Sequence, residues 1–537
     1  MKTKQPSQAL AGLQHLPLTM NRRGFICLSA CAIASALAAC GGGGGSGSAA
    51  VDASTTLPAG VAMTLTVGQA LPDTVTLDAG FNGLSIEKGH LHTSPDVYFG
   101  AGNANLVGLL NALGAGVLRI GGNSTDRITW TPTGAGQIKA QVSRSDIDNF
   151  ASFVKLCPNW KVIYGINFAG ARSSTSSPTL AADEAAYVAQ KLGSQLLAFE
   201  IGNEPDLYGN TNTPGLSGIT YDIFLNGGTV SQGAISGWNQ FEQAVAGAVS
   251  GAVFVGPAAS SDQAGWTQSF VASEGSKIAL LSEHYYISNY NTAAPSIAGM
   301  LNYPDSNLIA ELQSLQATAK RSGIPFRIDE ANSYFSSTQP AGVSNVFASA
   351  LWAIDFIFTH AQYGASGLNF HNNGTITSYT VIGDASGAVT AVQPLFYALL
   401  FFSQIFAGNT KTTGQLLSAT LSESDVAVSA FAVSTSDGAT YVVVNNKDTG
   451  NAANVTIALN VSASKATVTT LASSGSSAAA QLSNPGIYNS GTAITFGGEA
   501  VALNGAWTGT PQQTLNVTGK SVAVHVAPAS AALIRIQ

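Results

Sequence analysis

Short apolar runs alternate with longer helical stretches along the middle of the chain, and this alternation limits the possible folds more than any other feature. A run that is apolar throughout is typical of a strand buried on both faces, as in a parallel sheet. Repeated strand–helix units predict such a sheet, with the helices packed outside it. We count eight runs, at residues 81–87, 117–122, 161–168, 196–204, 252–257, 278–286, 325–330 and 367–371. Eight units predict an α/β fold, a (β/α)8 TIM barrel, over residues 76–408.

A different pattern begins after residue 408. Short runs rich in Val, Thr and Ala are separated by turn sequences such as Ser436-Asp437-Gly438 and Asp448-Thr449-Gly450. This spacing is typical of an antiparallel β-sandwich. We therefore predict a C-terminal antiparallel β-sandwich domain over residues 409–537, to which the N-terminal segment 62–75 adds a strand.

The first 61 residues have the features of an export segment and a linker. Arg22 and Arg23 precede an apolar run that is shorter than the roughly 20 residues a membrane-spanning helix needs. The run ends in Leu37-Ala38-Ala39-Cys40, which resembles the lipobox of bacterial lipoproteins. We predict a lipoprotein-type export signal over residues 1–40 with lipidation at Cys40, followed by a Gly/Ser-rich tether over residues 41–61. The expected location is the bacterial cell envelope, periplasmic or at the cell surface. An ordinary cleaved signal is the alternative.

Composition excludes several classes of protein and of site. Charged residues make up 9 % of the chain, against about 25 % in an average soluble protein. No basic cluster stands out, so we expect no nucleic-acid partner, and contact with a membrane only through the lipid anchor. Of the four cysteines, only Cys157 would remain free in the mature chain. We therefore expect no internal disulfide and no cysteine-based metal site.

Polar side chains gather where the predicted barrel strands end, which is where TIM barrels carry their active sites. The fourth strand ends in Gly202-Asn203-Glu204-Pro205-Asp206 and the seventh in Arg327-Ile328-Asp329-Glu330. Glu204 and Glu330 would face each other across the barrel mouth. Glycoside hydrolysis uses such a pair: one carboxyl group protonates the leaving oxygen, and the other attacks the anomeric carbon or activates water. Because side chains fill both roles, we expect no cofactor and no metal ion.

Three motifs carry a resemblance to a known family. They are Phe199-Glu200-Ile201-Gly202-Asn203-Glu204-Pro205-Asp206, Arg119-Ile120-Gly121-Gly122-Asn123-Ser124-Thr125-Asp126 and His284-Tyr285-Tyr286. Together they resemble glycoside hydrolase family 79, which includes heparanases and β-glucuronidases and lies in the large retaining clan of (β/α)8 glycosidases. The resemblance covers roughly residues 62–537. It implies a double displacement with Glu204 as acid/base and Glu330 as nucleophile.

The resemblance also implies contacts with the sugar. Asn203 would bind the 2-hydroxyl group, Glu87 would bind other hydroxyl groups, and Tyr286 would donate a hydrogen bond to the nucleophile. The full set of expected substrate-binding residues is Glu87, Asn123, Asn203, His284, Tyr286, Tyr334 and Tyr379.

Some of these polar residues have a structural interpretation beside the functional one. Glu200 has the same strand parity as Glu204 and is expected inside the barrel as a buried partner of Arg119. Asp329 has the opposite parity to Glu330 and is expected to pack against a helix. His284 and His371 are equally compatible with a catalytic environment and with a satisfied position in the core.

The sequence leaves the sugar open. The first prediction is an exo-type β-glucuronidase, because Tyr334 and Tyr379 follow strands seven and eight, where glucuronidases of this family are expected to bind the sugar carboxylate. However, Phe335 stands where a second hydroxyl group would be useful, and residues 329–410 contain no Lys or Arg. These features favour a neutral-sugar β-glycosidase, of β-glucosidase or diglycosidase type. A non-catalytic carbohydrate-binding surface lipoprotein is the third alternative.

Overall fold

A computed structural model describes residues 57–168, 177–208, 216–231, 233–261, 265–289, 293–335, 341–406, 410–486 and 493–537. The predicted export signal with Cys40, nearly all of the tether, and the predicted domain boundary at residues 408 and 409 lie outside these ranges. Within the described ranges, the longest and most apolar helices still fall short of what a membrane crossing requires.

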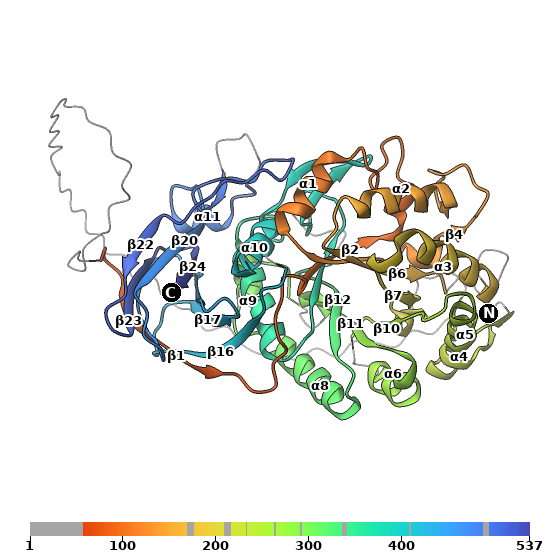
Figure 1. The fold of residues 1–537 in the computed structure, drawn as a ribbon, viewed down its shortest axis with the longest axis horizontal. Helices are drawn as coiled ribbons and strands as arrows, with labels where there is room; N and C mark the ends of the chain where they lie inside the picture. Colours follow the sequence, from red (N-terminus) through yellow and green to blue (C-terminus); the bar gives the residue numbers. More distant parts are fainter. Residues whose placement is uncertain are drawn as a thin grey trace, which may run out of the picture. The chain divides into compact units, whose positions relative to one another are not determined.

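Eight parallel strands close into a barrel in chain order (Figure 1). Each of the eight predicted apolar runs forms one of them, so the TIM-barrel prediction is confirmed. Their order follows the chain because each strand pairs with the next one along the sequence, and the eighth pairs with the first. The strands are β2 (Asn82–Glu87), β3 (Gly116–Gly121), β6 (Trp160–Ile166), β7 (Leu196–Ile201), β10 (Phe254–Ala259), β11 (Leu280–Tyr286), β12 (Phe326–Asn332) and β13 (Leu368–Asn372).

One main helix follows each barrel strand and covers the outside of the barrel. Local sequence sets their ends: the Ser177 side chain caps α3 ahead of Pro178, and Asp305 caps α8, which ends at Gly323 in a left-handed conformation. The helices are α1 (Ala104–Leu113), α2 (Arg144–Lys155), α3 (Pro178–Leu192), α5 (Trp238–Ala248), α6 (Trp266–Glu274), α8 (Ser306–Ser322), α9 (Ala348–Gln362) and α10 (Pro394–Ser403).

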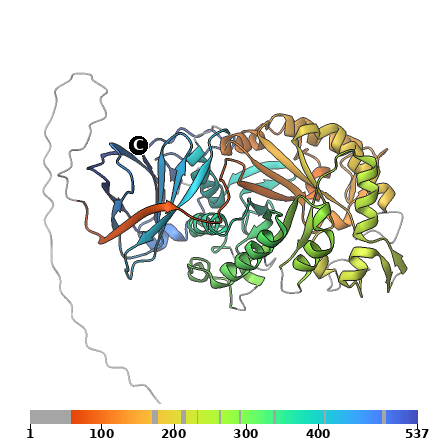
Figure 2. The same cartoon turned by 60° about the horizontal axis from the view of Figure 1, so that its bottom comes forward.

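Ten further strands form one sheet, mostly antiparallel, which matches the predicted sandwich-like domain, and three short two-stranded sheets (β4-β5, β8-β9 and β14-β15) stand apart from it. The N-terminal strand β1 (Val61–Ala70) belongs to the ten-stranded sheet and is the orange-red strand beside the blue C-terminal ones in Figure 2. It lies between β16 and β19, antiparallel to the first and parallel to the second. The C-terminal strands are β16 (Gly414–Leu421), β17 (Val428–Thr435), β18 (Thr440–Asn446), β19 (Ala453–Ala458), β20 (Lys465–Ser473), β21 (Ile494–Phe496), β22 (Gln513–Asn516), β23 (Ser521–Val526) and β24 (Ser530–Ile536).

Side chains along the central strands of this sheet point to alternate faces, and each face packs into its own hydrophobic core. On β18, Val442 and Val444 pack with Leu65 and Ile534 in a core that belongs to the β-domain alone. Val443, with the opposite parity, packs in the large core that also contains the barrel helices. Because side chains along a strand alternate between its faces, one strand serves both cores.

Candidate active site

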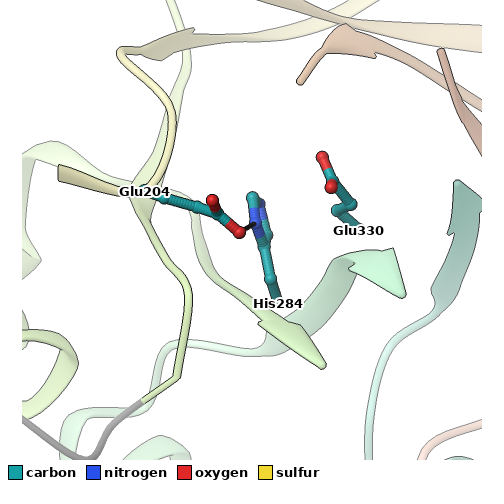
Figure 3. A group of neighbouring side chains, drawn as sticks. All are labelled: Glu204, His284 and Glu330. Atoms are coloured by element: carbon teal, nitrogen blue, oxygen red, sulfur yellow. Dashed lines mark hydrogen bonds and ion pairs between the residues drawn. The ribbon is translucent and has the colours of Figure 1, made fainter. Parts of the chain in front are cut away.

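Glu204 and Glu330 meet at the carboxyl ends of the barrel strands. Glu204 follows β7, and Glu330 lies in β12. One oxygen of each carboxylate and one nitrogen of His284 all lie within 4.8 Å of one another. Figure 3 shows the His284 ring between the two carboxyl groups, with the Glu204 side chain pointing at it. The two acids predicted from opposite sides of the barrel therefore share one small site.

The backbone that carries Glu204 is strained. Gly202 has φ +85° and Glu204 has φ +48°, a left-handed conformation that L-residues other than Gly rarely adopt. The turn leads from β7 directly into the 3-10 helix η4 (Pro205–Leu207), and the Glu204 N–H donates to the Ala258 carbonyl oxygen at 2.8 Å. This conformation directs the Glu204 side chain to the His284 ring. Such strain is found mostly where function requires a particular placement.

The Glu330 carboxylate is surrounded by donors. Arg119 Nη1 donates to Oε2 at 2.6 Å, and the Tyr286 hydroxyl donates to Oε1 at 2.8 Å. His371 Nδ1 lies 3.6 Å from Oε2. Burial opposes ionisation, but the positive charges of His371, His284 and Arg119 outweigh it and lower the pKa of Glu330 to about 2. Glu330 is therefore an ionised, firmly oriented carboxylate at neutral pH.

Arg119 connects this carboxylate to the inside of the barrel. Its guanidinium also donates to Glu200 Oε2 at 2.8 Å and to Asn203 Oδ1 at 2.9 Å. The predicted pairing of Arg119 with Glu200 is therefore confirmed. The sequence did not predict the direct contact of Arg119 with Glu330, because a strand pattern does not show how far a long side chain reaches across a barrel.

Asp329 corrects one expectation. It does not pack against a helix: it is fully buried inside the barrel, close enough to Glu200 to feel its charge and 3.6 Å from His284 Nε2. The cause is a β-bulge, because β12 pairs Ile328 with Glu283 and Glu330 with His284, which leaves Asp329 as an extra residue. A bulge breaks the alternation of side chains, so Asp329 and Glu330 both face inward. Burial, together with the Glu200 charge, raises the pKa of Asp329 well above its usual range.

His284 bridges the acids. Its Nδ1 lies 3.0 Å from Glu204 Oε1. Burial would lower its pKa, but the Glu330 charge and the hydrogen bond to Glu204 raise the pKa of His284 to about 9. Of the two open interpretations for this residue, the structure supports the one that places it among the site residues.

Asn203 keeps part of its hydrogen-bonding capacity unused. Its Oδ1 accepts from Arg119, whereas its buried Nδ2 has no protein partner. A buried unpaired donor costs free energy unless a ligand accepts from it. Asn203 therefore presents a fixed donor beside the two carboxylates.

Three further predicted residues lie at or after the ends of barrel strands β2, β3 and β13. Glu87, at the end of β2, accepts from the Ser124 N–H at 2.7 Å and lies 3.7 Å from His371 Nε2. Tyr379 packs against the rings of Tyr286 and His371, with centroid distances of 5.7 and 6.0 Å. Asn123 lies exposed in the turn after β3, next to Ser124.

Tyr334 lies elsewhere. It is buried, and its hydroxyl group has Ser296 and Asp305 as neighbours instead of the paired carboxylates. Asp305 also accepts from Tyr285, whose side chain points to the opposite side of β11 from His284 and Tyr286. These neighbours differ from those expected of a residue that lines the sugar site, so the role of Tyr334 stays a prediction. Its neighbour Phe335 is half exposed and packs edge-on against Tyr286.

Among the described residues, one group could offer three ligands to a metal ion, namely Glu204, His284 and Glu330. The Arg119 guanidinium already occupies Oε2 of Glu330 with a positive charge. A second cation there would meet strong repulsion, so the donor set fits a protonated His284 better than a divalent ion.

Comparisons with known proteins place this geometry in context. No family model matches the chain. A β-glucuronidase from Aspergillus niger is 23 % identical over an alignment 324 positions long, which covers 54 % of this chain and 58 % of that protein. The chain therefore spans little more than half the length of this curated relative.

Solved structures share the fold over most of the chain. The crystal structure of a 4-O-α-L-rhamnosyl-β-D-glucuronidase from Fusarium oxysporum matches with a TM-score of 0.63 and 17 % identity, over 89 % of this chain and 100 % of that one. An α-L-arabinofuranosidase from Thermotoga maritima matches with a TM-score of 0.60 and 16 % identity, over 88 % and 99 %. The chain thus has the barrel and β-domain fold of these glycosidases, and its sequence is similar to a β-glucuronidase, in line with the resemblance to glycoside hydrolase family 79.

Proposed function

We propose that the chain is a retaining β-glycoside hydrolase in which Glu330 is the nucleophile and Glu204 the acid/base. The observation that carries the proposal is the approach of the two carboxylates, with oxygens within 4.8 Å. Retaining enzymes hold their two carboxyl groups about 5–5.5 Å apart, whereas inverting enzymes leave roughly 6.5–9.5 Å for a water molecule. The short approach supports direct attack by one carboxylate.

The surroundings of each acid suit its proposed step. In the first step, ionised Glu330 attacks the anomeric carbon, and Glu204 gives its proton to the departing glycosidic oxygen. In the second step, Glu204 takes a proton from water, whose oxygen attacks the same carbon and releases Glu330. Tyr286 and Arg119 hold Glu330 in position throughout. Asn203 Nδ2 is available for the sugar 2-hydroxyl, a contact that strengthens as the transition state forms.

We propose β-glucuronides as the substrate class, with exo-type cleavage. Both the A. niger relative and the F. oxysporum structure are glucuronidases by name, and Tyr379 places a hydroxyl group near Tyr286 and His371. Burial, together with the Glu330 charge, raises the pKa of Tyr379, so it remains a hydrogen-bond donor at neutral pH. Such a donor can bind a sugar carboxylate without a full positive charge.

A β-glycosidase acting on neutral sugars is the second candidate. Phe335, half exposed beside Tyr286, offers an apolar ring where a carboxylate would need donors. Residues 329–410 contain no Lys or Arg. A panel of nitrophenyl β-glycosides separates the two candidates by kcat/KM. Turnover of none of them would support the third candidate, a carbohydrate-binding lipoprotein without activity.

The role of Glu204 has its own test. Glu204→Ala should slow substrates with poor leaving groups by ~10²–10⁴-fold, because only these need a proton in the first step. Substrates with activated aryl leaving groups should lose much less in their first step. Equal losses for both kinds of substrate would remove Glu204 from the role of acid.

We also propose that the mature protein is anchored in the cell envelope through a lipid on Cys40. The Leu37-Ala38-Ala39-Cys40 sequence supports this proposal. Cys40→Ser should abolish incorporation of labelled palmitate and release the protein from the membrane fraction. Unchanged fractionation of the variant would contradict it.

A further inference from the structure

The strained turn that carries Glu204 needs support from outside itself. Two left-handed residues, Gly202 and Glu204, stand on either side of Asn203. A conformation of this kind costs about 1–3 kcal/mol for a residue other than Gly and persists only where its surroundings hold it. The contacts of the turn with neighbouring loops therefore decide how well Glu204 stays in place.

Asp126 supplies that support from the loop after β3. It lies in the 3-10 helix η2 (Thr125–Arg127) and ends the motif that begins at Arg119. Its Oδ1 accepts from the Phe168 N–H at 2.9 Å, and its Oδ2 accepts from the Asn203 N–H at 3.1 Å. One buried carboxylate thus ties together the chain after β3, β6 and β7.

Tyr208 completes the support from the other side of the turn. Its hydroxyl group donates to Asp126 Oδ2 at 2.7 Å and accepts from the Asn203 N–H at 3.1 Å. Its ring stacks on Phe168 at 5.7 Å. A Cβ at Gly202 would lie 2.3 Å from the Tyr208 hydroxyl oxygen, so the close approach of Tyr208 requires glycine there.

We propose that Asp126 and Tyr208 are positioning residues that hold the Gly202–Glu204 turn so that Glu204 reaches the glycosidic oxygen. Both side chains act through the Asn203 backbone, which lies directly before Glu204. This inference rests on the proposed role of Glu204 as the acid. It predicts that loosening the support harms proton delivery, since misplacement by about 1 Å can cost ~10²-fold in rate.

The test compares two tyrosines that make the same bond in different places. Tyr208→Phe removes a buried hydroxyl bonded to Asp126 at 2.7 Å, and Tyr164→Phe removes a buried hydroxyl bonded to Glu184 at 2.7 Å. Tyr164 lies in β6 and faces α3, away from the paired carboxylates. Each variant is assayed with the 2,4-dinitrophenyl and the methyl β-glycoside of the sugar identified by the nitrophenyl panel. Melting temperatures are measured in parallel.

The expected result is a change in the ratio of the two activities. In Tyr208→Phe, kcat/KM for the methyl glycoside should fall about tenfold more than for the dinitrophenyl glycoside. Tyr164→Phe should lower the melting temperature similarly and leave the ratio unchanged. Asp126→Asn, which replaces an acceptor by a donor facing the Asn203 N–H, should shift the ratio in the same direction and further.

The inference is overturned if the ratio of kcat/KM for the two glycosides in Tyr208→Phe equals that of the wild type, whatever the loss of stability. Glu204→Ala serves as the reference in the same assay. If Glu204→Ala shifts the ratio and Tyr208→Phe does not, the positioning role fails while the proposed function stands. If Glu204→Ala itself leaves the ratio unchanged, the proposed function fails, and the inference fails with it.

Discussion

Buried cation–carboxylate groups are costly in a chain with few charges, and two of those among the described residues are built differently. One surrounds Arg119 inside the barrel and includes Glu200 and Glu330. The other pairs Lys447 with Asp355 at 2.6 Å, where the β-domain meets α9. Water reaches neither pair to a significant extent, so each must be stabilised by its own hydrogen bonds.

The polar atoms of the Lys447 group are nearly all paired with one another, the exception being the amide oxygen of Asn445. Asp355 accepts from Lys447, from Asn445 Nδ2 at 2.9 Å and from the Ser429 hydroxyl group. Asn445 also donates to the Leu351 carbonyl oxygen in α9. These bonds connect α9 to β17 and β18, and both carboxylate oxygens of Asp355 have donors. Such an arrangement is typical of a structural contact.

The Arg119 group remains open on one side. Glu330 shares the site with Glu204, whose side chain is partly accessible to solvent, and Asn203 Nδ2 has no protein partner. An unused buried donor is unfavourable in a purely structural group, whereas in a binding site the ligand restores the bond. What distinguishes the functional group from the structural one is therefore an unpaired donor beside two carboxylates, one of them partly exposed, whereas the Lys447 group leaves only an amide oxygen unpaired.

Removing the nucleophile should produce the largest effect on activity. Glu330→Ala should lower kcat/KM by ~10⁴-fold or more, because no glycosyl intermediate can form. Azide, entering the space of the lost carboxylate, should restore turnover of activated substrates and yield a glycosyl azide of inverted configuration. Both effects are measured on purified protein with an activated aryl glycoside. Retention of more than a few per cent of wild-type activity would show that Glu330 is not the nucleophile.

Breaking the Lys447–Asp355 pair should have the opposite effect: stability should fall and activity should not change. Lys447→Met leaves Asp355 buried without its cation, a change that typically costs about 3–5 kcal/mol of unfolding free energy. The kcat/KM of the folded protein should remain that of the wild type, since the pair joins α9 to the β-domain and Glu330 is held by other side chains, Arg119 and Tyr286. Urea unfolding and kinetics on the same preparation measure both quantities. A variant with wild-type stability and reduced activity would reverse the assignment of the two groups.

Two buried histidines, His284 beside the paired carboxylates and His360 in α9, should make the stability of the protein depend on pH in opposite ways. The Glu330 charge and the bond to Glu204 overcome burial and raise the pKa of His284 to about 9, whereas burial lowers the pKa of His360 in α9 to about 4. The proton on His284 therefore adds stability below its ordinary pKa near 6.5, and this contribution is lost as pH rises from there through 9. His360 must be neutral in the fold, so it costs stability as pH falls from 6.5 toward 4.

Single variants can separate the loss of stability above pH 6.5 from the loss below it. His284→Gln should flatten the loss of melting temperature above pH 6.5, and His360→Gln should flatten the loss below it. Each proton contributes at most about 1.4 kcal/mol per pH unit. Melting curves of the three proteins from pH 4 to 9 provide the measurement. If both variants changed the melting temperature on the same side of pH 6.5, the two histidines would not differ in charge as described.

The fold was predictable from sequence because its signals are local. A strand buried on both faces is apolar throughout, so each of the eight barrel strands could be recognised separately. Glu204 and Glu330 could be placed because each lies at the end of such a strand. The short turn motifs after residue 408 likewise marked the strands of the β-domain.

Other features depend on geometry that strand alternation does not encode. The bulge at Asp329 reverses its parity, so a strict period of two placed it outside the barrel. Tyr334 was assigned by its closeness to Glu330 in sequence, yet its side chain leaves the strand toward Asp305. Asp126 was visible as the end of a motif, but its role depends on bonds to Phe168 and Asn203, far away in sequence.

The smallest expected effect concerns the choice of sugar at the open side of the Arg119 group. Tyr379 lies against Tyr286 and His371, within the influence of the Glu330 charge. If the substrate is a β-glucuronide, Tyr379→Phe removes a hydrogen bond to the sugar carboxylate. Bonds to charged groups contribute about 1.5–3 kcal/mol, so KM for the glucuronide should rise at least about tenfold. The β-glucoside has no carboxylate and should be nearly unaffected.

The ratio of kcat/KM for nitrophenyl β-glucuronide and β-glucoside, measured in wild type and Tyr379→Phe, tests this expectation. A site built around a polar group can reject a substrate that lacks it by ~10⁴-fold, because its donors are then left unpaired. The wild type should therefore have a much higher kcat/KM for the glucuronide than for the glucoside. Tyr379→Phe should reduce this ratio. The half-exposed Phe335 beside Tyr286 supports the opposite result. If the glucoside is the better substrate and Tyr379→Phe has little effect, the open side accepts a neutral sugar, and the glucuronidase assignment is wrong while the roles of Glu204 and Glu330 stand.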